Sequence, residues 1–134
     1  MAGVVPNEAE TLIANLIFKQ ADVNRGSSLQ LGLFTNSGTI DDTFTYASVT
    51  EPTGGGYARI TLTDASWTVT DDTASYALQT FTATGGAYTG SVYGYFIATT
   101  GTAPKILAIE VDASGPYTMA ENDSYDVTPN ITVA

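Results

Sequence analysis

The sequence predicts a mainly β protein: a single β-sandwich, or a jelly-roll-like barrel, of about seven or eight antiparallel strands preceded by one N-terminal α-helix. Threonine and tyrosine, which favour pleated and half-buried surfaces, are frequent. From residue 28 onward, short segments with alternating apolar residues are separated by turn residues about every ten positions. No helical segments alternate with them, which excludes a parallel βαβ fold. The length of 134 residues favours one domain over 1–134, with the helix at 7–20 and the β-sandwich at 28–134.

Residues 7–20, NEAETLIANLIFKQ, predict the helix. Asn7 can cap the first turn, and Glu10, three residues later, completes a close variant of the capping box. The residues with helical spacing that form one apolar stripe are Ala9, Leu12, Ile13, Leu16 and Ile17. Phe18 points about 100° beyond the end of that stripe. We therefore expect Phe18 either to contact a neighbouring subunit or to pack beneath the following loop.

Segments with a period of two residues predict the strands. In order, these segments are 28–35, 57–63, 67–70, 74–83, 91–99, 105–112 and 124–133, and 43–50 is either a short strand or an irregular helical turn. Residues 91–99 are apolar on both faces, which indicates a central strand. Pro129 has no backbone donor, so we expect the last strand to lie at an edge or to contain a bulge.

Composition excludes several classes of function. The sequence contains no cysteine and no histidine, which removes disulfides, thiolate or imidazole metal sites, and the commonest general base. The net charge of −10 disfavours nucleic acid as a partner, because that affinity comes mainly from basic side chains. No segment approaches the roughly 20 apolar residues of a membrane span. The N-terminus does not resemble a signal peptide, so we expect a soluble protein made in the cytoplasm.

Arg59, one of four basic residues, follows the glycine-rich segment at 51–56. It could act as an anion clamp or as a structural tie. The glycines lack the spacing of a phosphate-binding loop and are typical of a turn with positive φ. Alternation in 57–63 places Arg59 and Tyr57 opposite the inward-facing Ala58, Ile60 and Leu62. No nucleophile or base motif adjoins Arg59, so we favour the structural role.

Two further patterns have alternative interpretations. The acidic clusters, at 41–42, 71–72 and 121–126, could supply oxygen ligands to a cation but are typical of ordinary turns. Tyr88, Tyr93, Tyr95 and Tyr117 could form a sugar-binding face, although aromatic faces more often pack or build interfaces. A pair of carboxylates could hydrolyse glycosides, but a chain of this size has little room for a deep cleft. We therefore expect no catalytic residue, no cofactor and no metal, and predict that the protein is not an enzyme.

Six segments of the chain form a distinctive order: LQLGLFTN (29–36), GYARITL (56–62), WTVT (67–70), ALQTFTATG (77–85), VYGYF (92–96) and VTPNITV (127–133). This order resembles a set of small virion structural proteins of tailed bacteriophages, some of which are similar to head decoration, or cement, proteins. The resemblance covers most of the chain and carries no catalytic residues. It implies an architectural role for Tyr57, Ala58 and Arg59.

The resemblance implies a protein of the virion, most favourably of the head surface, that stabilises the capsid through symmetric contacts. Its partners would be the major capsid protein or other virion subunits and further copies of itself, with a trimer favoured. The alternatives are a neck, tail or head-fibre component, or a carbohydrate-binding module. The candidate contact and structural residues are Val4, Val5, Phe18, Tyr57, Arg59, Trp67, Tyr93 and Tyr95.

Overall fold

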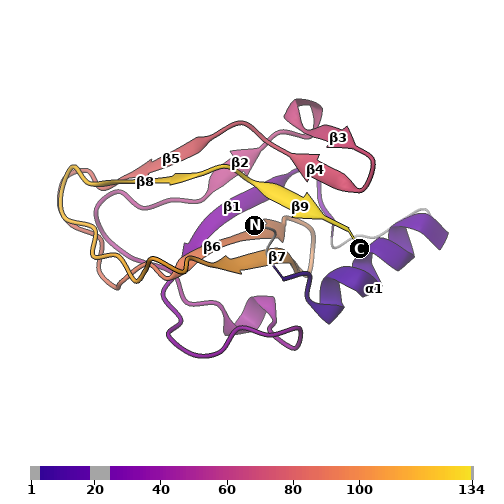
Figure 1. Ribbon diagram of the computed structural model, residues 1–134, viewed down its shortest axis with the longest axis horizontal. Coiled ribbons are helices and arrows are strands. Elements are labelled where there is room, and N and C mark those ends of the chain that lie inside the picture. Colours follow the sequence, from indigo (N-terminus) through magenta and orange to yellow (C-terminus); the bar gives the residue numbers. More distant parts are fainter. Residues whose placement is uncertain (1–3, 19–24, 134) are drawn as a thin grey trace.

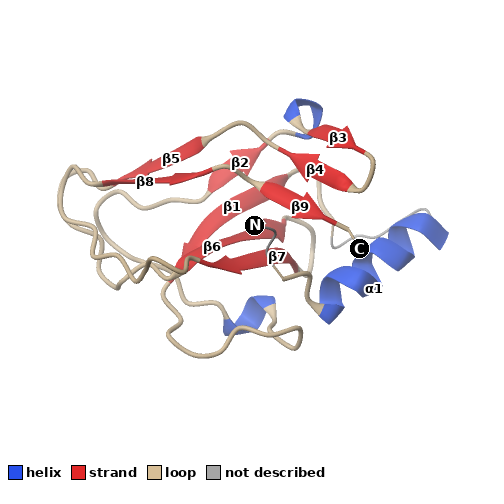
Figure 2. Cartoon of the chain, in the orientation of Figure 1, coloured by secondary structure: helices blue, strands red, loops and turns tan. Residues whose placement is uncertain are grey.

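The described residues of the computed structural model, 4–18 and 25–133, form one α-helix, two short 3₁₀ helices and nine strands (Figure 1). The helix α1 spans Asn7–Phe18, and the 3₁₀ helices η1 and η2 span Tyr46–Ser48 and Asp64–Ser66. The strands are β1 (Leu29–Phe34), β2 (Ile60–Leu62), β3 (Thr68–Thr70), β4 (Thr73–Ser75), β5 (Gln79–Thr82), β6 (Gly94–Thr99), β7 (Ile106–Val111), β8 (Ser124–Val127) and β9 (Asn130–Thr132). The mainly β fold with an N-terminal helix is confirmed, and strands with their loops dominate Figure 2. Residues 19–20 of the expected helix lie outside the described residues.

The strands form three antiparallel sheets with the orders β2-β1-β6-β7, β3-β4-β9 and β5-β8. The four-stranded sheet makes one layer, and the two smaller sheets follow each other along the opposite layer (Figure 1). The arrangement is sandwich-like and does not close into a barrel. Strand β6 pairs with both β1 and β7, so the prediction of a central strand over 91–99 is confirmed.

Two of the predicted strands are each divided in the structure, which explains why the described residues have more strands than expected. Segment 74–83 forms β4 and β5, and segment 124–133 forms β8 and β9. Ser75 pairs with Asn130, and Gln79 pairs with Val127. Segment 74–83 therefore contains one residue more between these two pairs than segment 124–133 does. Pro129 lies in this break, where its carbonyl accepts a hydrogen bond from the Tyr76 N–H at 3.0 Å. A proline cannot donate to a ladder, so the ladder is interrupted at the expected place.

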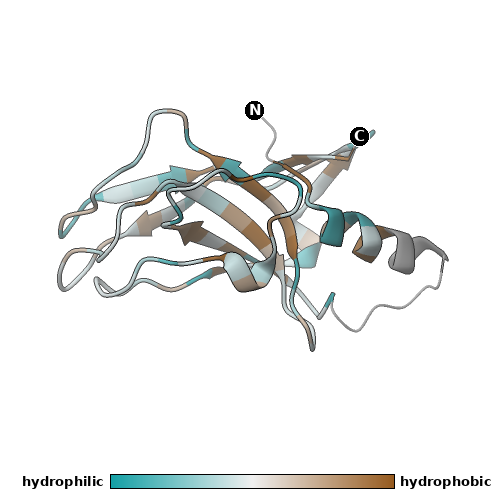
Figure 3. Cartoon of the chain, turned by 90° about the horizontal axis from the view of Figure 1, so that it is seen from below, coloured by the Kyte–Doolittle hydropathy of each residue, from teal (hydrophilic) through white to brown (hydrophobic). Residues whose placement is uncertain are grey.

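Apolar side chains fill both faces of the four-stranded sheet. One core lies between the two layers, and its buried members from the strands are Leu29, Leu31, Leu33, Leu62, Phe81, Ile97, Ala108, Tyr125, Val127 and Ile131. A second core lies on the outer face of the sheet and contains Phe34, Phe96, Ala98, Ile106 and Ile109. Side chains from segment 36–51, including Phe44 and Tyr46, cover this second core. In Figure 3 several strands are accordingly coloured as hydrophobic over much of their length, whereas others are pale or hydrophilic.

The face pattern predicted for 57–63 is correct only from Arg59 onward. Leu62 is buried and Ile60 half-buried against the core between the layers, whereas Ala58 is exposed. The Tyr57 ring packs on that same core rather than on the opposite face. The reason is that β2 begins at Ile60, so the residues before it do not follow strand alternation.

The N-terminal segment packs against β7. Val4 and Ile109 exchange two backbone hydrogen bonds of 2.7 and 3.0 Å, so Val4 extends the sheet beyond β7. The Glu8 carboxylate accepts hydrogen bonds from the backbone N–H groups of Ile106 at 2.7 Å and Tyr46 at 3.1 Å. These contacts tie the start of α1 both to the sheet and to the segment that covers its outer face. Within the described ranges, no helix is long and apolar enough to cross a membrane.

Candidate interaction surfaces

The predicted contact residues do not form one surface; they lie in several separate parts of the fold. Arg59 and Tyr57 share one polar network, Val5 and Trp67 line an apolar groove, and Tyr95 lines a polar depression; their sites are described below. Two further candidates lie elsewhere: Val4 pairs with β7, and Tyr93 packs against the second core. Phe18 is the last residue of α1, but its side chain lies outside the described residues.

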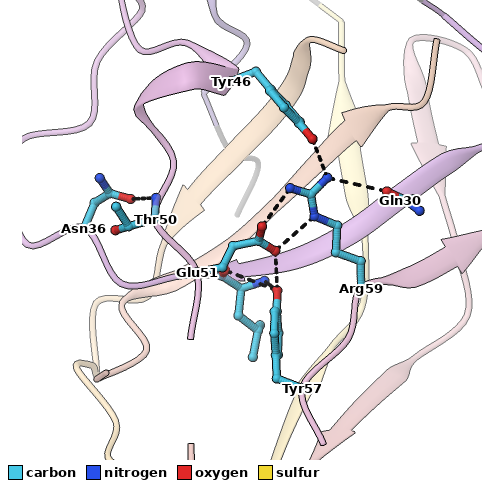
Figure 4. Close-up of polar contacts among 8 residues, drawn as sticks. Gln30, Asn36, Tyr46, Thr50, Glu51, Tyr57 and Arg59 are labelled. Atoms are coloured by element: carbon cyan, nitrogen blue, oxygen red, sulfur yellow. Dashed lines mark hydrogen bonds and ion pairs between the residues drawn. The ribbon is translucent and has the colours of Figure 1, made fainter. Parts of the chain in front are cut away.

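Arg59 forms the centre of a half-buried polar network on the outer face of the sheet (Figure 4). Its Nε donates to Glu51 Oε1 at 3.0 Å and its Nη2 to Glu51 Oε2 at 2.7 Å, a bidentate pairing. Its Nη1 donates to the Tyr46 hydroxyl at 2.8 Å and lies 3.5 Å from Gln30 Oε1. The guanidinium carbon also lies 5.1 Å from the centre of the Tyr46 ring and 5.2 Å from that of Phe96.

The charges in this network reinforce one another. The hydrogen bonds from Arg59 to Glu51 raise the pKa of the guanidinium above its usual range. The Tyr57 hydroxyl donates to Glu51 Oε1 at 2.7 Å and accepts from the Leu33 N–H at 2.9 Å. Burial of Tyr57, and then its hydrogen bond to Glu51, raise the pKa of this phenol well above its usual value. The charged guanidinium and the neutral phenol are thus the forms that this network stabilises.

The geometry favours a structural tie over an anion clamp at Arg59. Its strong donors point at side chains of the same chain, and its one carboxylate partner neutralises its charge. The network joins Gln30 of β1, Arg59 just before β2, and segment 36–51, which contributes Tyr46 and Glu51. It thereby holds the cover of the second core in place. The preceding Gly54, Gly55 and Gly56 have φ angles of 71°, 53° and 68°. The predicted turn with positive φ is therefore confirmed.

An apolar groove of about 440 Å³ lies where the two layers meet the N-terminal segment. The four-stranded sheet contributes Leu29 and Leu107, and the N-terminal segment contributes Val5 and Ile13. The residues from the other layer are Trp67, Val69, Ala74, Ile131 and Val133. Val69 is 70% exposed and Val133 49% exposed, which is unusual for aliphatic side chains beside a core.

Trp67 lies in this groove with its ring edge-on to Tyr76, at a centroid distance of 5.2 Å. Its indole Nε1 is buried and has no hydrogen-bond partner among the described residues, a state that costs about 1–3 kcal/mol. At the groove rim, Arg25 Nη2 and Asp64 Oδ1 form an ion pair of 2.8 Å. The groove therefore presents an apolar floor with charged side chains at its margin.

A polar depression of about 480 Å³ lies beside the ends of β7 and β8. Two phenols there donate to carboxylates: Tyr95 to Glu110 Oε2 at 2.7 Å and Tyr125 to Asp112 Oδ2 at 2.8 Å. Burial, and then these hydrogen bonds, raise the pKa of both tyrosines above the usual value. A neighbouring depression is lined by Tyr117 and also by Tyr125, which lines the first one as well. Tyr95 and Tyr117, two members of the predicted sugar-binding face, therefore line adjoining depressions.

The other tyrosines of that predicted face do not join them. Tyr88 is buried in the core between the layers, and Tyr93 packs against the second core. The four tyrosines therefore do not form one exposed aromatic face.

Several carboxylates of the acidic turns accept hydrogen bonds from residues nearby in the sequence. Asp41 Oδ1 accepts from both the N–H and the hydroxyl of Thr43, and these hydrogen bonds lower the pKa of the exposed Asp41. Asp112 and Asp123 accept from backbone N–H groups two or three residues away. Across residues 4–18 and 25–133, no group of three or more acidic side chains is arranged to hold a metal ion.

Sequence reasoning missed most partners of the predicted residues. Glu51 and Tyr46 hold Arg59, and Tyr125 and Asp112 form half of the polar depression. Nothing local in the sequence marks these pairs, because they join segments that meet only in the folded chain. The groove residues Val69 and Val133 carried a weak signal, since each is an aliphatic residue between two polar or small neighbours near a turn or terminus.

Comparison of the chain with protein-family models, with curated proteins and with solved structures found no match.

Proposed function

We propose that this chain is a non-enzymatic structural protein of a bacteriophage virion that decorates the capsid and stabilises it through protein–protein contacts. The observation that carries the contact role is the apolar groove, where Val69 and Val133 are exposed beside Trp67. Exposed apolar surface of this kind is typical of a site that another protein covers. The assignment to a virion rests on the sequence resemblance of segments such as LQLGLFTN and GYARITL.

Decoration acts by mass action. A protein that binds only the assembled shell shifts the equilibrium away from disassembly, and many weak copies act together. The partners would be the major capsid protein or other virion subunits and further copies of this chain, with the trimer that the sequence resemblance implies favoured. Light scattering of the purified protein at several concentrations would measure the oligomer, and a monomer at all concentrations would remove the trimer from the proposal.

Counting copies per particle tests the proposal. Particles made from the genome that encodes this chain should contain the protein, measured by quantitative mass spectrometry of separated heads and tails. Hundreds of copies in the head fraction would support a decoration role, since a lattice repeats each contact many times. A few copies in the tail fraction would support the alternative of a neck, tail or head-fibre component. Absence from both fractions would overturn the proposal.

A carbohydrate-binding module is the second candidate function. The observation that favours it is the polar depression, which combines the phenols of Tyr95 and Tyr125 with the carboxylates of Glu110 and Asp112. Aromatic rings and paired polar groups are general features of small-ligand sites. A glycan array with the wild-type protein tests this function. Binding that is lost in Tyr95→Ala, while Tyr93→Ala still binds, would place the sugar in this depression.

A further inference from the structure

We propose that the apolar groove binds an extended, basic and aliphatic segment of a partner polypeptide, which adds as a strand to the outer edge of β3. This inference rests on the proposed function, because it names the partner segment for that contact surface. Its observations are the open edge of β3, the exposed side chains of the groove and the distribution of charge around it.

Strand β3 is the edge of its sheet. It pairs with β4 through Thr68↔Ser75, Val69↔Ala74 and Thr70↔Thr73. On its other side, none of the described segments forms a backbone hydrogen bond with it. Hydrogen-bonded and non-hydrogen-bonded pairs alternate in an antiparallel ladder.

The direction of the free backbone groups follows from β4. The Val133 N–H donates to the Asp72 carbonyl at 2.9 Å, so the next pair, Thr73↔Thr132, is a non-hydrogen-bonded pair. The backbone N–H and C=O of Thr73 therefore point away from β9 and toward β3. The next residue, Ala74, then faces β9, so the N–H and C=O of Val69 point away from β4. An added strand would find one donor and one acceptor there, and main-chain pairing is the usual source of affinity in strand addition.

The side chain of Val69 supplies the second element of recognition. It is 70% exposed and lines the apolar groove together with Val133 and Leu107. A strand paired with β3 would project alternate side chains onto this groove, because successive side chains point to opposite faces. Aliphatic residues at alternate positions fit a lining of this kind.

The distribution of charge around the groove indicates which residues of the partner segment should accompany its aliphatic side chains. In the described part of the chain, Arg25, Arg59 and Lys105 each lie within 4.0 Å of a carboxylate of the same chain. The turn between β3 and β4 is Asp71–Asp72, whose exposed carboxylates have no cationic partner among the described residues. With a net charge of −10, the chain would repel an acidic segment and attract a basic one. Lysine or arginine beside the aliphatic residues is therefore the complementary chemistry, and a second copy of this acidic chain fits less well.

Model peptides test this inference with the intact protein. The probe is a peptide of alternating valine and threonine with a lysine at each end, and its binding is followed by the fluorescence of Trp67, the single tryptophan. Two matched peptides carry glutamate at the ends or an N-methyl group on the central valine. We expect each change to weaken binding about tenfold or more, through lost charge complementarity or a lost backbone hydrogen bond.

Matched variants locate the site. Val69→Lys should weaken the lysine peptide about tenfold or more by placing a like charge in the groove. Val111→Lys adds the same charge at an aliphatic residue that is 44% exposed on β7 and outside the groove lining, and should retain binding. Thermal melting of both variants shows that they fold. Asp71→Asn with Asp72→Asn should reduce the salt dependence of binding without abolishing it.

Each outcome decides the inference. Equal binding of the N-methylated peptide overturns strand addition, and equal binding of the glutamate peptide overturns the basic partner. No binding of any peptide, or a Trp67 response to a fatty acid alone, overturns the peptide site. If the peptides bind as expected but purified particles lack the protein, the proposed function fails while the groove assignment stands. If particles contain the protein and the peptides do not bind, the groove assignment fails while the proposed function stands.

Discussion

Arg59 shows how one side chain can hold together segments that are distant in the sequence. It contacts Glu51, Tyr46 and Gln30 and lies over the ring of Phe96. Because the exposed fractions of the Arg59 and Glu51 side chains are 21% and 24%, the pair is partly shielded from water. Its contribution should therefore exceed that of a surface ion pair.

Arg59→Ala should lower the free energy of unfolding by about 2–3 kcal/mol, because Glu51 and the Tyr46 hydroxyl lose a charged donor. Denaturant titration measures this change. Arg25→Ala is the matched control: its partner Asp64 is 54% exposed, so the loss should stay below about 1 kcal/mol. Equal effects of the two substitutions would contradict the structural role of Arg59.

The tyrosines predict how stability depends on pH. The pKa values of Tyr57, Tyr95 and Tyr125 are raised above the usual value of 10.0, so the folded protein favours the neutral phenols. This stabilisation is complete below pH 10 and is lost as the pH rises further, at about 1.4 kcal/mol per pH unit for each tyrosine. In Tyr57→Phe the slope of the free energy of unfolding above pH 10 should be shallower by that amount. An unchanged slope would show that Tyr57 ionises as freely in the folded protein as in the unfolded chain.

At the scale of elements, close packing between strands and the contacts of α1 determine how the sheet is covered. A β-carbon on Gly32 of β1 would overlap the Phe96 ring on β6. Gly32→Ala should therefore destabilise the protein by about 1–3 kcal/mol through overpacking of the second core. Gly38→Ala is the control, since among the described residues only the chain neighbours of Gly38 lie within 4 Å of the added group, and its effect should stay within about 0.5 kcal/mol. Comparable midpoints of denaturation for the two variants would mean that Phe96 can move aside freely.

Glu8 is the acceptor that docks α1 on the sheet. Glu8→Ala should lower the free energy of unfolding by about 2–3 kcal/mol, because the N–H groups of Ile106 and Tyr46 lose their common partner. Glu8→Gln keeps an acceptor oxygen and should lose less. The exposed Glu10, two residues on, is the control, and Glu10→Ala should change the value by about 0.5 kcal/mol or less. Hydrogen exchange at Ile106 should accelerate in Glu8→Ala alone; unchanged exchange would argue against this docking.

For the whole molecule, the testable property is that the stability of the fold does not depend on a bound metal ion. The acidic turns use their carboxylates as local hydrogen-bond acceptors, as at Asp41 and Asp112. A chelator should therefore leave the melting temperature within about 1 °C, because no bound ion would be removed. A large decrease would reveal a cation that stabilises these turns.

Local sequence patterns were sufficient to predict the class of fold, the helix at the N-terminus, the central strand over 91–99 and the interruption at Pro129. These features follow from local rules: period-two alternation, the helical spacing of apolar residues and the missing donor of proline. Asn7, the expected cap, is instead the first residue of α1, and the Pro6 carbonyl accepts from the N–H groups of Ala9 and Glu10. The same local rules placed Ala58 wrongly, because alternation fails where a strand has not yet begun.

The tertiary structure alone decided which residues meet. Glu51 lies eight residues before Arg59, and Val69, Leu107 and Val133 of the groove come from three separate strands or their ends. Such meetings depend on the order of strands in two layers, which periodicity along the chain does not encode. The physical reason is that burial selects a face for each side chain locally, whereas its partner on that face is selected by long-range packing of the whole sandwich.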